Sequence, residues 1–260
     1  MTFSKESELN RIAVITGAAS GIGLGVSKRL ISEGWTVWAL DISEASLQQA
    51  AGQLNAGDQY RTATCDVAST ASTIQAFARI SASTKSIEAL ICCAGAIRIG
   101  WMEEYTPEEV DLMLGVNIKG PWLCVRTALP LLREGANVDK PKRVVIVGSV
   151  SGLRPKVGSG MYAATKAAVH VLTGIMAVEL APSGITVNAI APGTTDTPMI
   201  VQMGQTTSKV PFKLSGKSPL GRMAQPDDMA DAVSYLLSDG ARYINGVVLP
   251  VDGGTRAAHV

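Results

Sequence analysis

A short apolar strand that runs straight into a glycine-rich turn is the feature that most constrains this fold. Ile12 to Thr16 is rich in β-branched residues and leads into Gly17 to Gly23 (GAASGIG) and then a helical pattern. Such glycines let the backbone approach a pyrophosphate, whose charge is stabilised at the following helix N-terminus. The turn therefore predicts a dinucleotide site, with simple packing as the alternative. The residues expected at the phosphates are Gly17, Ser20, Gly21, Ile22 and Gly23.

The rest of the chain repeats this alternation of short strands and longer helical segments. Strands that are apolar throughout are typical of a parallel sheet covered on both faces. Strands are expected at residues 12–16, 36–41, 60–64, 89–93, 144–149, 186–190 and 247–251. Helices are expected at residues 23–34, 43–54, 69–83, 107–133, 161–180 and 226–238. We predict a single α/β domain over residues 1–260, a doubly wound Rossmann-type fold around a seven-stranded parallel sheet.

One long segment, residues 192–225, lacks this rhythm. Irregular segments of that length are usually lids or binding loops. We therefore expect residues 192–225 to form a substrate loop.

The charge balance excludes two classes of partner. Lys and Arg total 23 against 22 Asp and Glu, a net charge of +1, which is too small to hold nucleic acid or an anionic membrane. The four cysteines lie in apolar or strand-like segments without C-x-x-C spacing, so reduced thiols and no metal site are expected. Residues 1–10 lack the apolar run of a secretory signal, and no apolar run reaches the roughly 20 residues of a membrane helix. These features predict a cytoplasmic protein with a small-molecule substrate.

One acidic residue ends the second expected strand, and another follows the third. Asp41 stands where a carboxylate can accept hydrogen bonds from the adenosine ribose hydroxyls. It would also repel a 2′-phosphate, and no Arg or Lys adjoins it or occurs in the glycine turn, which favours NAD over NADP. Asp66, with Val67, is placed to bond the adenine amino group. Each aspartate has an alternative role as the cap of the next helix.

The most informative group is Ser149, Tyr162 and Lys166. Tyr162 and Lys166 are four residues apart in a helical segment, so they share one face. An ammonium beside a phenol favours the phenolate, and we expect the pKa of Tyr162 to fall from about 10 towards that of a usable general base. Ser149 ends a strand, where doubly wound sheets hold their ligands, and can bond the reacting oxygen. A bare Tyr-Lys pair is usually a surface feature, but the serine and the glycine turn argue against coincidence.

With these residues in place, the chain resembles the short-chain dehydrogenase/reductase family over essentially its whole length. The matching motifs are Thr16 to Gly23, Asp66, Ala94-Gly95, Asn117, Ser149, Tyr162-x-x-x-Lys166, Pro192-Gly193 and Val251 to Gly254. This combination is highly specific. The resemblance implies an oxidoreductase that transfers a hydride between a nicotinamide cofactor, here NAD, and a substrate alcohol or ketone.

The resemblance also implies a role for each matched residue. Tyr162 is the acid/base, and Lys166 additionally holds the nicotinamide ribose. Ser149 orients the substrate oxygen, Asn117 supports Lys166 through a water relay, and Thr197 contacts the nicotinamide end. The other residues assigned to the cofactor are Asp41, Asp66, Val67, Ala94, Gly95, Tyr162, Pro192, Gly193 and Thr195.

The chain departs from the family at Cys92-Cys93, where two asparagines usually precede Ala94-Gly95. Neighbouring side chains on a strand point to opposite faces, which disfavours a redox role for the pair. We expect both thiols to be core residues.

Four stretches, residues 94–100, 192–197, 212–214 and 219–222, are similar to 2,3-dihydro-2,3-dihydroxybenzoate dehydrogenases, which make the catechol acid of siderophores. Oxidising one ring hydroxyl of that substrate gives a dienone that enolises to an aromatic ring, which draws the reaction forward. The substrate carries a carboxylate, for which Arg98, Arg154 and Lys156 are candidates. We expect Arg98 to bind it through two parallel bonds, with a solvated surface charge as the alternative. Met161 is expected to line the same pocket.

Two other functions remain open. A general carbonyl or alcohol dehydrogenase, acting on a sugar, a cyclic ketone or a 3-oxoacyl thioester, would share the catalytic residues and differ only in its pocket. A nucleotide-sensing protein without catalysis would commonly lack the Tyr or Lys that this chain retains.

The resemblance further implies a homotetramer. In it, the helices at residues 107–133 and 161–180 pair across a two-fold interface. Packing of a helix on the sheet would itself require one apolar face, so the apolar periodicity alone does not give the number of subunits.

Overall fold

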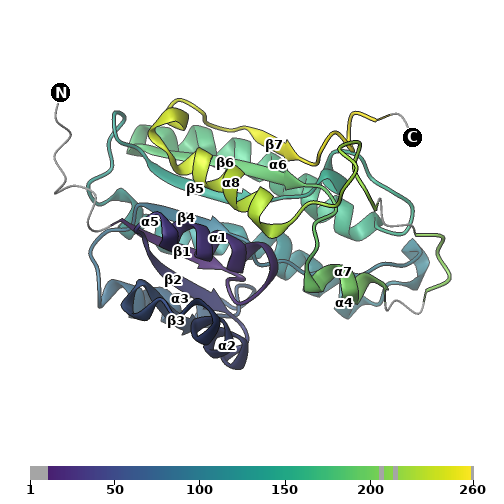
Figure 1. The fold of residues 1–260 in the computed structure, drawn as a ribbon, viewed down its shortest axis with the longest axis horizontal. Helices are drawn as coiled ribbons and strands as arrows, with labels where there is room; N and C mark the ends of the chain where they lie inside the picture. Colours follow the sequence, from purple (N-terminus) through teal and green to yellow (C-terminus); the bar gives the residue numbers. More distant parts are fainter. Residues whose placement is uncertain (1–10, 205–207, 213–215, 259–260) are drawn as a thin grey trace.

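The fold is a seven-stranded parallel sheet with helices on both faces (Figure 1). In a computed structural model of the chain, residues 11–204, 208–212 and 216–258 are described. The strands are β1 (Ile12–Thr16), β2 (Thr36–Asp41), β3 (Tyr60–Thr64), β4 (Ala89–Cys92), β5 (Lys142–Val147), β6 (Ile185–Pro192) and β7 (Val248–Val251). They pair in the order β3-β2-β1-β4-β5-β6-β7, which confirms the predicted fold class.

Eight α-helices connect and cover the described strands. They are α1 (Gly21–Ser32), α2 (Glu44–Leu54), α3 (Thr70–Ser81), α4 (Pro107–Leu114), α5 (Gly120–Arg133), α6 (Gly160–Leu180), α7 (Pro198–Gly204) and α8 (Pro226–Leu237). Sequence-based expectations for residues 1–10, and for Lys213 and Leu214 in the expected substrate loop, concern residues outside those described.

Two hydrophobic clusters lie on opposite faces of the sheet. One gathers Phe77 of α3 and Val169 of α6 with residues of α5, and all of these are buried. The other gathers Leu30 of α1, Leu47 of α2 and Met229 of α8. Because helices cover both faces, the inner strands β1, β4, β5 and β6 bury both sets of alternating side chains.

Helix α6 belongs to this core. Among the described residues, the stretch Gly160–Ser183 is long and apolar enough to cross a membrane by length and composition, and half of its most apolar window is buried inside the protein. Its inner face packs against β6 and the β5 side of the sheet. The apolar residues on the inner face of α6 are therefore explained by their packing against the sheet.

The structure corrects two predicted elements. The helix expected at residues 107–133 is interrupted by one π-helical turn, Gly115–Lys119, between α4 and α5. The segment 192–225, expected to be irregular, contains helix α7. The signal for α7 is present in the sequence, since Pro198 stands at its first position and Gly204 at its end. The π-turn has no comparable signal in its residue types.

Candidate active site

The glycine turn connects β1 to α1 in a conformation that depends on glycine. Gly17 and Gly21 have positive φ angles of 64° and 51°. A Cβ on Gly23 would lie 2.1 Å from the carbonyl oxygen of Gly17. The first turn of α1 carries no acidic side chain, and its N-cap residue Ser20 makes no side-chain capping bond. The amides at the start of α1 are therefore not satisfied by a side-chain cap and suit an anion such as a pyrophosphate.

A cleft of about 1180 Å³, open solvent included, lies beside this turn at the carboxyl ends of the strands. Its walls contain most of the predicted cofactor residues: Gly17, Ser20, Gly21, Ile22, Gly23, Asp41, Asp66, Val67, Ala94, Gly95 and Thr197. A glycine turn at a helix N-terminus, with acidic residues deeper along the cleft, fits a nicotinamide dinucleotide.

Asp41 and Asp66 face the cleft rather than capping helices. Asp41 accepts hydrogen bonds from the amides of Ala19 (3.2 Å) and Ser43 (3.1 Å). The cap of α2 is Ser43, whose hydroxyl accepts the amide of Ser46. Ser69 caps α3 in the same way. Because these serines cap α2 and α3, neither aspartate is needed as a helix cap. Both lie in the cleft wall, where they can bind the adenosine part of the cofactor.

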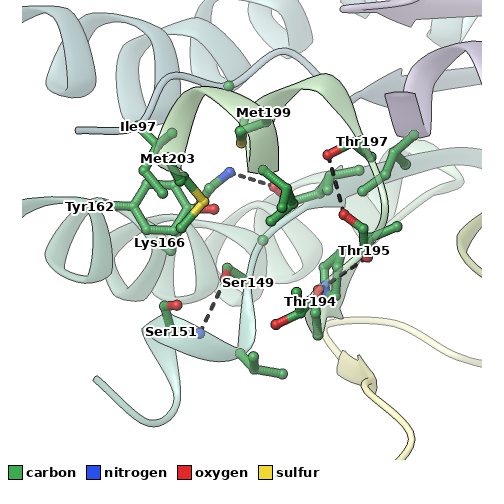
Figure 2. Close-up of a pocket in the computed structure, with 18 of the residues that line it drawn as sticks. Ile97, Ser149, Ser151, Tyr162, Lys166, Thr194, Thr195, Thr197, Met199 and Met203 are labelled. Carbon is green, nitrogen blue, oxygen red and sulfur yellow. Dashed lines mark hydrogen bonds between the residues drawn. The ribbon is translucent and has the colours of Figure 1, made fainter. Parts of the chain in front are cut away.

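A second cavity, of about 1010 Å³, adjoins the cleft (Figure 2). Ile22, Cys93, Gly95, Thr197 and Met199 line both spaces, so the two share a wall. Six further predicted residues line the second cavity: Ser149, Tyr162, Lys166, Pro192, Gly193 and Thr195. The catalytic group therefore lies directly beside the cofactor residues.

The Ser149, Tyr162 and Lys166 side chains come from two elements that pack on each other. Ser149 follows β5, and its hydroxyl accepts the amide of Ser151 at 3.1 Å. Lys166 Nζ donates to the carbonyl oxygen of Val147, the last residue of β5, at 2.8 Å. The same ammonium lies 5.8 Å from the centroid of the Tyr162 ring. The helix spacing thus sets the distance between Tyr162 and Lys166, and the bond to β5 fixes the pair beside Ser149.

Burial determines the protonation of this pair. It raises the pKa of the Tyr162 phenol above 10, and a hydrogen bond with Ser149 partly offsets the effect. Burial also lowers the pKa of Lys166 to about 8, while the nearby thiols Cys93 and Cys92 act in the opposite direction. The expected fall in the Tyr162 pKa is therefore wrong, because the cost of burying a phenolate exceeds the effect of the hydrogen bond with Ser149.

Asn117 lies in the π-turn and is almost fully buried. Its side chain forms two 2.8 Å hydrogen bonds with the backbone of Ala96, one donated and one accepted. It also donates to Thr165 Oγ1 at 3.0 Å, and that hydroxyl donates to the carbonyl of Tyr162. A Cβ on Gly95 would lie 3.6 Å from Asn117 Oδ1 and 3.8 Å from Lys166 Nζ. Asn117 is therefore joined to the residue before Lys166, and both side chains border the same space at Gly95.

The cavity wall combines two chemically different groups of residues. Met199 and Met203 of α7 lie with Ile97 near the Tyr162 ring (Figure 2). Phe212 lies in the same wall, which also contains Arg154, Lys156 and Arg256. Apart from Lys166, these are the cationic residues in the described wall, which contains no Asp or Glu. Met199 and Met203 lie in the expected substrate loop, residues 192–225, whereas Arg256 was not expected in the wall, because its distance along the chain hides its proximity to Tyr162.

The structure corrects two predicted substrate contacts. Arg98 does not line the cavity: it pairs with Glu109 at 3.5 Å, and its side chain is 45% exposed. Met161 is absent from the described wall and packs in a hydrophobic cluster with Ile99 and Tyr162. Arg98 adjoins the lining residue Ile97 in sequence and Met161 adjoins Tyr162, but neither lines the cavity itself.

The cysteine pair behaves only partly as expected. Cys92 packs in the hydrophobic cluster of one sheet face, and Cys93 packs against the other. Cys93 is half-buried and lines both spaces, so it is a wall residue rather than a core residue. Within the described residues, no group of three or more His, Cys, Asp or Glu is placed to hold a metal ion.

Known proteins with this sequence pattern are oxidoreductases. A family model described as enoyl-(acyl carrier protein) reductase matches residues 17–256. The 2,5-dichloro-2,5-cyclohexadiene-1,4-diol dehydrogenase LinX of Sphingobium indicum is 32% identical over 245 residues, which cover 94% of this chain and 95% of that protein. The cis-4-hydroxycyclohexanecarboxylate dehydrogenase of Sinomonas cyclohexanicum is 33% identical over 258 residues, covering 97% and 99%.

Solved structures agree with this assignment. The 3-ketoacyl-(acyl-carrier-protein) reductase from Brucella melitensis, complexed with NADH, superposes with a TM-score of 0.86 at 32% identity, covering 95% of this chain and 98% of that one. The RhlG/NADP complex of Pseudomonas aeruginosa has a TM-score of 0.86 at 27% identity, covering 95% and 96%. Sequence and fold agree over nearly the whole length, and the chain belongs to the short-chain dehydrogenase/reductase family of oxidoreductases.

Proposed function

We propose that this protein is an NAD-dependent dehydrogenase that oxidises a secondary alcohol on a cyclic substrate. The observation that carries the proposal is the convergence of Ser149, Tyr162 and Lys166 on a cavity that shares a wall with the glycine-turn cleft. A protein that only bound a nucleotide would not need a buried phenol and a buried ammonium beside that cleft.

The proposed roles follow from the positions of the side chains. Ser149 and Tyr162 hold the substrate hydroxyl, and Tyr162 removes its proton. NAD held in the glycine-turn cleft would supply the acceptor for the hydride of the alcohol carbon. The Lys166 ammonium, held by the Val147 carbonyl, stabilises the phenolate form of Tyr162 that accepts this proton. Asn117 keeps the backbone around Ala96 and Thr165 in place beside Lys166. In the reverse direction, the protonated Tyr162 supplies the proton to the substrate oxygen.

Replacement of Tyr162 by Phe tests this function. We expect Tyr162→Phe to lower kcat by about 10²-fold to 10⁴-fold, because the only change is the loss of the proton-carrying hydroxyl. NADH formation with a cyclic alcohol measures kcat, and NADH fluorescence measures cofactor binding, which we expect to be retained.

The matched control is Tyr235→Phe, at a half-exposed tyrosine on α8 outside the cavity. It should leave kcat unchanged. Normal turnover by a folded Tyr162→Phe protein would contradict the proposed mechanism.

We propose NAD rather than NADP because of the charge around Asp41. The described residues that line the cleft include Asp41 and Asp66 but no Lys or Arg. A 2′-phosphate at the ribose would therefore meet a carboxylate and no counter-charge.

Replacement of Asp41 by Ser tests the cofactor preference. We expect Asp41→Ser to raise the KM for NAD on the order of tenfold, since a charged acceptor for the ribose hydroxyls is lost. The KM for NADP should fall, since the repulsion is lost as well. Initial rates with both cofactors measure the change, and Glu44→Gln, one turn away in α2 and outside the cleft, is the control. A parent enzyme that prefers NADP would refute the assignment.

We propose that the substrate carries a carboxylate, with 2,3-dihydro-2,3-dihydroxybenzoate as the specific candidate and 2,3-dihydroxybenzoate as its product. The apolar residues of the cavity wall suit a ring, and Arg154, Lys156 and Arg256 in the same wall suit an anion. Related proteins act on a chlorinated cyclohexadiene diol and on a hydroxycyclohexanecarboxylate, by their names. Both names describe cyclic alcohols as substrates, and the second of these substrates carries a carboxylate.

Variants of the cationic wall residues test this substrate class. We expect Lys156→Gln combined with Arg256→Gln to lower kcat/KM for a cyclic hydroxy acid about tenfold, because two charges facing the carboxylate are removed. The kcat/KM for a neutral cyclic alcohol should change less than about twofold. Arg98→Gln is the matched control, since Arg98 pairs with Glu109 outside the cavity. Equal losses of kcat/KM for the hydroxy acid and for the neutral alcohol would refute the proposal that the substrate carries a carboxylate.

A reductase of 3-oxoacyl thioesters is the second candidate. The family description and the Brucella structure point to acyl carrier protein substrates in related proteins, and the apolar wall residues Met199 and Met203 suit an acyl chain. A general carbonyl reductase would use the same catalytic residues, so sugars and simple cyclic ketones are further candidate substrates. A non-catalytic nucleotide sensor is disfavoured because Asn117, Ser149, Tyr162 and Lys166 are all present and in place.

We propose a cytoplasmic homotetramer of single-domain subunits, assembled through α5 and α6. Val171, Ile175 and Val178 on the outer face of α6 are 65%, 50% and 76% exposed in one chain, and Trp122 on α5 is 42% exposed. A row of exposed apolar residues on neighbouring helices is typical of a protein interface.

Sedimentation velocity tests the assembly. The parent protein should sediment as a tetramer, and Val178→Glu should shift it to smaller species, because a charge would be buried in the interface. Val138→Glu, at an equally exposed valine elsewhere, should leave the tetramer intact. A parent protein that sediments as a monomer would contradict the proposal.

A further inference from the structure

His170 extends the catalytic face of α6 by one further turn. Tyr162, Lys166 and His170 follow each other at four-residue intervals in this helix, which places all three on one side. His170 is only 9% exposed. Neither the proposed mechanism nor the packing of the sheet requires a histidine there, so its contacts must explain it.

The imidazole of His170 lies under the turn that carries Ser149. The amide of Ser149 donates to His170 Nε2 at 3.4 Å. A Cβ on Gly148 would lie 2.2 Å from the same nitrogen, and a Cβ on Gly152 would lie 2.9 Å from Cε1. Two glycines on either side of Ser149 thus leave room for the ring. The turn after β5 rests directly on the imidazole.

Two bonds from α6 therefore hold the end of β5. Lys166 donates to the carbonyl of Val147, and His170 accepts from the amide of Ser149, two residues later. The Ser149 backbone is extended, with φ of −168° and ψ of 149°, and its hydroxyl also accepts the amide of Ser151. Small rotations of this backbone would move the hydroxyl, so the amide bond bears on the geometry of catalysis.

The protonation state of His170 suits an acceptor. Burial and the nearby Lys166 charge lower the pKa of His170 to about 4. The ring is therefore neutral near pH 7. Because Nε2 accepts the Ser149 amide, the ring proton belongs on Nδ1. Nδ1 is buried and has no hydrogen-bond partner among the described residues.

We propose that His170 is a positioning residue that fixes Ser149 through its backbone amide, so that the Ser149 hydroxyl meets the substrate oxygen beside Tyr162. This inference rests on the proposed dehydrogenase function. It adds a third residue of α6 to the site, one that acts through Ser149 and touches neither substrate nor cofactor. The competing explanation is that His170 only fills space beneath two glycines.

Leu and Gln variants separate these explanations. His170→Leu keeps an apolar side chain but removes the acceptor, and we expect kcat to fall about tenfold to a hundredfold. The KM and the NADH affinity should stay close to those of the parent enzyme. In His170→Gln, the amide oxygen can reach the position of Nε2, and most of the kcat should return. The control is Val169→Ala, which opens a core cavity on the same helix away from the site.

A purely structural role predicts other results. Loss of kcat in Val169→Ala equal to that in His170→Leu would overturn the proposal, as would a His170→Gln enzyme no better than His170→Leu. The Ser149→Ala background supplies a further test. If His170 acts through the Ser149 hydroxyl, adding His170→Leu to Ser149→Ala should have almost no further effect on kcat. Losses that multiply in the double variant would refute the proposal.

An NMR measurement keeps the test independent of turnover. The chain contains only two histidines, so the imidazole nitrogens of His170 can be assigned by comparison with His170→Gln. A neutral ring at pH 7 with Nε2 unprotonated and Nδ1 protonated is expected. A proton on Nε2, or a charged ring, would overturn the proposal. If the parent enzyme oxidises no alcohol, the proposed function fails, while this measurement still decides whether His170 accepts the Ser149 amide.

Discussion

The parallel direction of all seven strands is the constraint on which the site depends. It brings every carboxyl end to one edge of the sheet, and the order β3-β2-β1-β4-β5-β6-β7 then reverses the winding between β1 and β4. Helix α1, which follows β1, packs in the cluster on one face, and α5, which follows β4 through α4, packs in the cluster on the other. The loops diverge between them, so Ile22 after β1 and Cys93 after β4 border both the cofactor cleft and the catalytic cavity.

Helix α6 adds the second constraint, a charge buried without a carboxylate partner among the described contacts. Lys166 is satisfied by the Val147 carbonyl, which provides a hydrogen bond but no opposite charge. Burial lowers the pKa of Lys166, and burial together with the Lys166 charge lowers the pKa of His170 one turn away. An ammonium paired with a carboxylate would be more stable, but the carboxylate would weaken the positive electrostatic potential at Tyr162. The site therefore accepts a local electrostatic cost in exchange for a positive potential where a phenolate has to form.

Short motifs predicted the elements whose geometry is local. All seven strands were placed within a few residues, because each is an apolar run ended by a turn, and the Tyr162–Lys166 pairing follows from helix spacing alone. The π-turn at Asn117 was missed because it depends on the bonds of Asn117 to Ala96 and Thr165, which are distant in sequence. The pKa of Tyr162 was misjudged because the sequence shows the neighbouring ammonium but not the degree of burial. Arg98 was misplaced because adjacency to the lining residue Ile97 does not determine the direction of a side chain.

The same distinction explains why the substrate is harder to derive than the reaction. Ser149, Tyr162 and Lys166 come from one strand end and one helix, whose relative position is fixed by a buried hydrogen bond and by the hydrophobic core. The two groups of wall residues come from segments far apart along the chain, with Met199 in α7 and Arg256 beyond β7. Arg154 ties two of these segments together by donating to the carbonyls of Thr255 and Ala258. Changes in such segments alter the shape and charge of the cavity without disturbing β5 or α6, so one catalytic group can serve different substrates.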